Sequence, residues 1–182
     1  DKVREALKRL KDKMETYERR SKKHIEDHKR KLKEYEERVR RNIKRLREEL
    51  KKLEEDAKTR GPREKDVTEI LKRIEDHLEE HHRRSEEVKR DLERNLEEAH
   101  KDSRRVLEEL KKELEKIRRG DLSEELLKRV DELARRIMKR IKELNRENER
   151  VVRESLKRVD ELNKRSEKVH KEVLDRLEEL RR

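Results

Sequence analysis

The apolar residues of this chain recur with the period of a straight α-helix, and that spacing limits what the chain can fold into. One apolar line runs from Val3 to Ala57, where 15 steps of three or four residues cover 54 positions, or 3.6 residues per step. A left-handed coiled coil keeps a period near 3.5 residues, whereas about 3.6 residues per turn is the pitch of a helix without supercoil. The pattern therefore predicts long, straight, amphipathic helices.

The same spacing appears as a repeat of 18 residues, which equals five helical turns. Residues that share one face of a helix recur at this interval. The sets are Leu7, Ile25 and Ile43; Leu126, Leu144, Leu162 and Leu180; Leu127, Asn145 and Asn163; and Met138, Leu156 and Leu174. Evolved bundles seldom keep one period through several helices, and the average helix has only about 11–12 residues.

Two short breaks interrupt this pattern. At the first, Gly61 suits a left-handed helix end and Pro62 cannot continue the preceding helix. The next helix begins either near Pro62 or at Asp66, and the sequence leaves both starts open. At the second break, Gly120 ends a helix and Ser123 can cap the next one.

Short loops make consecutive helices antiparallel, so the fold class expected is all-α. We predict a bundle of three long, straight helices, or a part of a larger oligomeric bundle. The expected organisation is a single domain over 1–182 with helices near 2–59, 63–119 and 124–181.

The composition narrows the class of protein further. Of the residues, 60% are charged and 27% are hydrophobic, and Lys or Arg alternate with Glu at four-residue spacing, as on an ion-paired helix surface. The formal charge is +11, but the cations form no separate patch and only two tyrosines could stack on bases, so we expect no nucleic-acid partner. We also expect no membrane span, no signal peptide and no disulfide.

Taken together, these features resemble those of de novo designed helical bundles of the parametric kind. The resemblance covers all 182 residues and rests on the 18-residue period, the two minimal loops, the Glu/Lys/Arg surface and the scarcity of glycine and proline. It implies a soluble recombinant scaffold that has no natural substrate, cofactor or compartment and is not an enzyme.

Polar residues interrupt the apolar lines of all three helices. The loop positions place residue i of the first helix level with about 122 − i of the second helix and about i + 120 of the third. The levels expected are His24 and His28 with Asn95, Asn145 and Asn148; Tyr35 with Ser85 and Ser155; Asn42 with His77, His81 and Asn163; and Ser21 with Ser103 and His100. Aligned polar groups can satisfy one another and so specify helix pairing, whereas an unpaired buried group costs ~1–3 kcal/mol.

The histidines among these residues suggest a response to acid. No apolar residue lies between Leu78 and Val88, yet histidines occupy positions 77, 81 and 82. A buried, neutral imidazole has a pKa below about 6.5, so its contribution to stability is lost as the pH falls below that value. We therefore expect His24, His28, His77 and His81 to act as a pH switch, with membrane contact conceivable only after the bundle opens in acid.

Metal binding is an alternative, because the pairs His24/His28 and His77/His81 have the i, i+4 spacing that can chelate zinc. A third ligand would have to come from another helix, and the residues level with these pairs are mostly Asn and Ser, which bind zinc poorly. We predict no metal site, no cofactor site and no catalytic residue.

A second apolar stripe on the third helix raises the possibility of a partner chain. It lies about 90° from the main apolar line and consists of Leu127, Ala134, Met138, Val152, Leu156 and Leu174. In an interaction module, one chain of a designed homo- or hetero-oligomer, this stripe would stay exposed and recruit a partner. The narrower apolar faces of the other two helices favour a closed bundle, which requires no partner.

Overall fold

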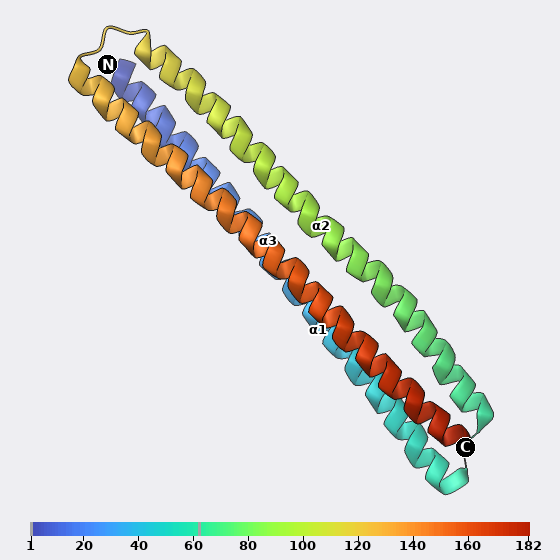
Figure 1. Cartoon of the computed structure of the whole chain (residues 1–182). Coiled ribbons are helices and arrows are strands. Elements are labelled where there is room, and N and C mark those ends of the chain that lie inside the picture. Colours follow the sequence, from blue (N-terminus) through green and yellow to red (C-terminus); the bar gives the residue numbers. More distant parts are fainter. Residues whose placement is uncertain (1, 62) are drawn as a thin grey trace. The chain divides into compact units, whose positions relative to one another are not determined.

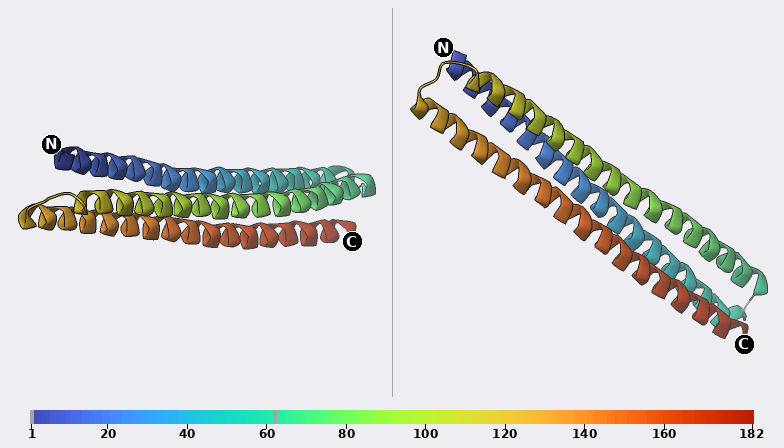
Figure 2. Two further views of the ribbon diagram at one scale, coloured as in Figure 1. Left: turned by 90° about the horizontal axis from the view of Figure 1, so that it is seen from above. Right: turned by 45° about the horizontal axis from the view of Figure 1, so that its top comes forward.

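The computed structural model describes residues 2–61 and 63–182, and these form three α-helices in succession (Figure 1). The helices are α1 (Lys2–Arg60), α2 (Glu64–Arg118) and α3 (Glu124–Arg181), and the described residues contain no strand. Each helix runs without a break in both views of Figure 2. The prediction of an all-α fold built from three long helices is confirmed, and the helix ends lie within one residue of those expected.

The helix ends follow from local sequence. Gly61 adopts a positive φ of 78°, and its amide donates to the carbonyl of Ala57 at 3.1 Å, which closes the last turn of α1. The carbonyl of Arg63 accepts the amide of Val67 at 3.2 Å, so α2 begins at Glu64, between the two starts that the sequence left open. Pro62 lies outside the described residues.

The second loop is closed by the capping residue expected there. The Ser123 hydroxyl accepts the amide of Leu126 at 3.3 Å, and the Ser123 carbonyl accepts the amide of Leu127 at 3.1 Å. Gly120 ends the preceding segment through a hydrogen bond from its amide to the carbonyl of Ile117 at 3.2 Å.

The packing of the chain divides into two compact units, and every helix contributes to both. The first unit consists of the described residues up to Lys29 together with Leu92–Glu154, and the second consists of Arg30–Asp91 and Ser155–Arg182. The expectation of a single domain stays a prediction.

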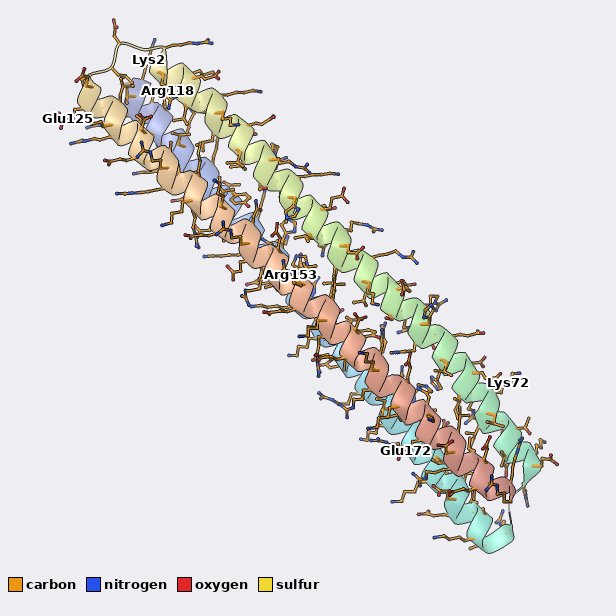
Figure 3. The ribbon with its side chains drawn as sticks, in the orientation of Figure 1. Lys2, Lys72, Arg118, Glu125, Arg153 and Glu172 are labelled. Carbon is orange, nitrogen blue, oxygen red and sulfur yellow. The ribbon has the colours of Figure 1, made fainter. Side chains whose placement is uncertain are left out.

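Each unit has its own apolar core. In the first unit, the core centres on residues such as Leu10, Ile141 and Leu144, none more than 1% exposed. In the second unit, Leu46, Leu50 and Ile74 have the same role. Long charged side chains extend outward from the helices, as Figure 3 shows for many Lys, Arg and Glu residues.

Ion pairs between helices give the chain directions within each unit. In the first unit, Arg9 pairs with Glu113 at 3.7 Å and Lys13 pairs with Glu109 at 3.8 Å, so α1 and α2 run antiparallel.

In the second unit, α1 and α3 run parallel. Glu36 accepts a hydrogen bond from Arg158 at 2.7 Å, and Glu54 pairs with Arg176, so the two helices rise together. Both pairs are 122 positions apart along the chain.

Candidate functional site: polar layers and a histidine cluster

A hydrogen-bonded network joins all three helices inside the second unit. The Tyr35 hydroxyl on α1 donates to Oδ1 of Asn163 on α3 at 2.5 Å, and Nδ2 of Asn163 donates to the Ser85 hydroxyl on α2 at 2.6 Å. Tyr35 and Ser85 are each only 2% exposed. Burial raises the pKa of Tyr35 above its usual value of 10, so the phenol remains a proton donor at neutral pH. An asparagine suits the centre because one amide supplies both an acceptor and a donor.

The partners of Asn163 differ from those that the sequence suggested. We expected Asn163 to lie level with Asn42, His77 and His81, but its hydrogen bonds join it to Tyr35, 128 positions away, and to Ser85, 78 positions away.

The error arises at the loop between α2 and α3, which lies in the first unit. Arg118, the last residue of α2, pairs with Asp131 at 3.0 Å, so α3 begins almost two turns before it faces the end of α2. The estimate from the sequence assumed that the two helices face each other from the middle of the loop. It therefore placed α3 several residues out of register.

The first unit contains a related polar layer made of pairwise bonds. The Tyr17 hydroxyl donates to Oδ1 of Asn145 at 3.1 Å, and Nδ2 of Asn148 donates to the Ser21 hydroxyl at 2.8 Å. Ser103 makes no bond across the helices in the described structure, because its hydroxyl donates to the carbonyl of His100 on its own helix at 2.9 Å. Ser21 was expected beside Ser103 and instead contacts Asn148.

Tyr17 is a member of this layer that the sequence reasoning did not single out. It precedes Tyr35 by 18 residues, as Asn145 precedes Asn163, so the repeat itself would have identified it. Burial raises the pKa of Tyr17 to about 12, with the nearby charge of Asp102 acting in the same direction and a hydrogen bond to Ser21 opposing it.

Three other candidate residues lie near these layers without joining them. Asn42 and Asn95 are half-buried, and Ser155 is 2% exposed. Among the described residues, no hydrogen bond is found for these three side chains. The expected pairs of Asn42 with Asn163, and of Ser155 with Tyr35, are therefore not formed, which follows from the shifted register of α3.

The two first-unit histidines occupy different environments. His24 is half-buried, and its Nε2 lies 3.4 Å from the carboxylate of Asp102 on α2. His28 is fully buried. The structure thus brings His24 to an acidic residue rather than to the asparagines Asn95, Asn145 and Asn148.

A histidine cluster lies in the second unit, next to the Tyr35 network. His77 and His81 are half-buried on α2, and the His81 ring stacks on Tyr35 with 6.0 Å between ring centroids. His170, on α3, is only 4% exposed. His170 was not among the candidate residues, although its position four residues after Ser166 would have suggested an intrahelical contact.

The hydrogen bond of His170 determines its tautomer. Its Nδ1 lies 2.5 Å from the carbonyl oxygen of Ser166, and a carbonyl only accepts, so Nδ1 carries the proton in the neutral ring. The other nitrogen, Nε2, is enclosed and has no hydrogen-bond partner in the described structure, and the same is true of Nε2 of His81. Two enclosed imidazole nitrogens therefore face their surroundings with unused lone pairs.

The pKa values of both histidines are lowered below the usual 6.5, chiefly because burial penalises the charged ring. For His81, the neighbouring His170 also lowers the pKa, while Asn163 and Glu167 act the other way. For His170, the bond to the Ser166 carbonyl opposes burial, and His77 lowers the pKa further. Both rings are therefore neutral at pH 7.

Within the described residues, no group of three or more His, Cys, Asp or Glu side chains is arranged to hold a metal ion. None of the described helices has a segment long and apolar enough to cross a membrane.

Comparisons with known proteins place the chain in no family. No protein-family model matches it, and no curated protein matches it. One solved structure that it resembles is titled "Computationally designed three helix bundle". The two are 18% identical, the match covers 98% of this chain and 87% of the other, and the TM-score is 0.39.

Proposed function

We propose that the chain is a designed structural scaffold whose polar layers specify helix pairing and whose second unit is sensitive to acid. The observation that carries the proposal is the Tyr35–Asn163–Ser85 network, which takes one residue from each helix. A scaffold of this kind requires no catalytic residue and no cofactor.

The network supports one register over its alternatives. Sliding α3 by one turn, about 5.4 Å, would break both hydrogen bonds of Asn163. Tyr35 and Ser85 would then be buried without partners, at a cost of ~1–3 kcal/mol for each group. An all-apolar layer would tolerate the same slide with little loss, so the polar layer adds specificity.

Acid sensitivity follows from the histidine cluster, and its sign can be worked out from the two lowered pKa values. His81 faces His170 and Glu167 on α3, His82 on its own helix and the Tyr35 ring on α1, while His170 faces His77. Because the folded-state pKa lies below the unfolded value of about 6.5, unfolding takes up protons in acid. The stabilisation is complete above pH 6.5 and is lost as the pH falls from there through the folded-state pKa.

Hydrogen exchange measured by mass spectrometry between pH 7 and pH 4 tests this proposal. After correction for the intrinsic pH dependence of exchange, peptides from Arg30–Asp91 should lose protection between about pH 6.5 and 5. Replacing His81→Asn together with His170→Asn should remove that loss. The matched control is His24→Asn with His100→Asn, because those rings lie 3.4 Å and 3.0 Å from carboxylates with which they can pair when protonated.

Two outcomes would contradict the acid response. One is a loss of protection that begins only below about pH 4.5, where carboxylates titrate. The other is an equal effect of the control substitutions. Either result would leave the polar layers as devices for pairing alone, which a neutral-pH comparison of helix register can still test.

The alternative, an interaction module completed by another chain, finds less support. It would need the second stripe of α3 to be exposed, yet Ala134 and Val152 in that stripe are 5% and 2% exposed. Among the described large hydrophobic residues, only Leu126 is exposed, at 36%. Light scattering at neutral pH distinguishes the two functions, since the scaffold is expected to be a monomer of 22.7 kDa.

A further inference from the structure

A groove in the second unit has no part in the polar layers. It lies between α1 and α3 and encloses about 310 Å³. Its floor is formed by Val39, Ile43 and Leu162, and its walls include the aliphatic stems of surrounding Lys and Arg side chains. The volume is at the lower end of that found for small-molecule sites.

The rim of the groove is strongly basic. Six cations and two carboxylates line it; the cations are Arg40, Lys44, Arg47, Lys51, Arg158 and Arg165, and the carboxylates are Glu36 and Glu48. Arg158 is paired with Glu36, and Arg47 lies 3.8 Å from Glu172. In the described structure no ion pair or hydrogen bond is found for the side chains of the other four cations, which are therefore available to a ligand.

We propose that this groove binds a small anionic amphiphile, a molecule with an apolar chain and a carboxylate, sulfate or sulfonate head. The apolar chain would lie along Val39 and Ile43, and the head would pair with Lys44 or Arg165. Charge-assisted hydrogen bonds to a carboxylate or sulfate are the strongest contacts that these side chains can make. The proposal is independent of the scaffold function.

The repeat of 18 residues supplies an internal comparison. Eighteen positions earlier, in the first unit, Glu26 takes the place of Lys44, Glu147 takes that of Arg165, and Ser21 takes that of Val39. The equivalent surface thus has two acids in place of two cations and a hydroxyl in place of an apolar floor residue. Basic charge and apolar floor occur together only at the second-unit copy of these positions.

Other occupants fit the groove less well. A second copy of this chain carries a formal charge of +11, so the two basic surfaces would repel each other. A polyanion without an apolar part would satisfy the rim but leave the floor unused.

Isothermal titration calorimetry with decanoate, at moderate ionic strength, is the direct test. Decanoate should bind at least about tenfold more tightly than decyltrimethylammonium, which has the same chain and the opposite charge. Affinity should also rise from octanoate to dodecanoate, by at most about fourfold for each added methylene.

Charge-reversal variants locate the site. Lys44→Glu with Arg165→Glu introduces the acids found at the equivalent first-unit positions and should weaken decanoate binding at least about tenfold. Lys72→Glu with Arg90→Glu is the matched control, because both residues are exposed on α2 in the same unit and the net charge changes equally. Should the reversed variant fold poorly by circular dichroism, Lys44→Gln with Arg165→Gln should show a smaller loss in the same direction.

Three results would overturn the proposal. Equal weakening by the control variant would mean that decanoate responds to the overall charge alone. Tripolyphosphate binding as tightly as decanoate, and lost in the same variant, would assign the groove to polyanions. Dimers detected by light scattering, and lost in the same variant, would assign it to a second copy of the chain.

Discussion

The two units contain the same tyrosine and asparagine at the same 18-residue interval, yet they use them differently. In the second unit, Asn163 bonds to both Tyr35 and Ser85, so one amide links three helices. In the first unit, Asn145 accepts from Tyr17 at the longer distance of 3.1 Å, and the serine equivalent to Ser85 bonds to its own helix.

The difference shows that a repeated residue type does not guarantee a repeated interaction. Ser103 and Ser85 are equally buried, at 3% and 2%, so burial cannot explain why only Ser85 reaches across. A serine hydroxyl rotates freely and can choose between the carbonyl of its own helix and a neighbouring amide. In the first unit, Asn148 offers a second amide in the same layer and bonds to Ser21, so the polar groups are satisfied in pairs.

The largest expected effect comes from removing the central amide of each layer. Asn163→Ala should lower the free energy of unfolding by about 2–4 kcal/mol, because Tyr35 and Ser85 both lose their partner inside the protein. Asn145→Ala should cost about 1–2 kcal/mol, since only Tyr17 is affected. Urea denaturation of both variants measures the pair, and equal losses would show that the two layers are equivalent in energy.

A smaller effect is expected at the two serines. Ser85→Ala removes the acceptor of the Asn163 amide and should cost about 1 kcal/mol. Ser103→Ala breaks only a contact with its own helix and should change the stability by less than about 0.5 kcal/mol, because alanine also favours the helix. Thermal melts followed by circular dichroism would reveal the difference, and a large loss for Ser103→Ala would indicate a cross-helix role.

The smallest effects are expected at the paired surface ions. Glu18 with Arg140 in the first unit, and Glu36 with Arg158 in the second, have the same chain separation of 122 residues. Their side chains are 29–45% exposed, so double-mutant cycles should give only about 0.2–1 kcal/mol for each pair. Both coupling energies should shrink in high salt. A value above about 2 kcal/mol in one unit would reveal a difference that the geometry does not.

The helices themselves could be predicted from the sequence almost to the residue. The apolar period, Gly61 and the Ser123 cap each act locally, so they need no knowledge of neighbouring helices. The polar composition of the interior could also be anticipated, because Tyr35 and Asn163 lie on apolar faces where a hydrophobic residue would otherwise be expected.

The partners within the layers could not be predicted in the same way. They depend on how far α3 extends past the end of α2, and a shift of a few residues is enough to exchange Asn42 for Tyr35 as the partner of Asn163. They also depend on side-chain reach, since a tyrosine hydroxyl spans a distance that no serine can. For His170, the partner is the carbonyl of Ser166, a backbone group with no distinctive sequence signal.

The ion pairs at Glu18, Glu36 and Glu54 mark a motif whose length is a whole number of helical turns. A block of that length can be inserted into every helix without rotating any downstream residue to a new face, and it adds about 27 Å to each helix. Chain length is thereby separated from interface chemistry, so longer or shorter members of a series could be assembled from the same blocks. Each block could in turn carry its own polar layer, which would make the order of the layers along the helices an address that only a matching arrangement can satisfy.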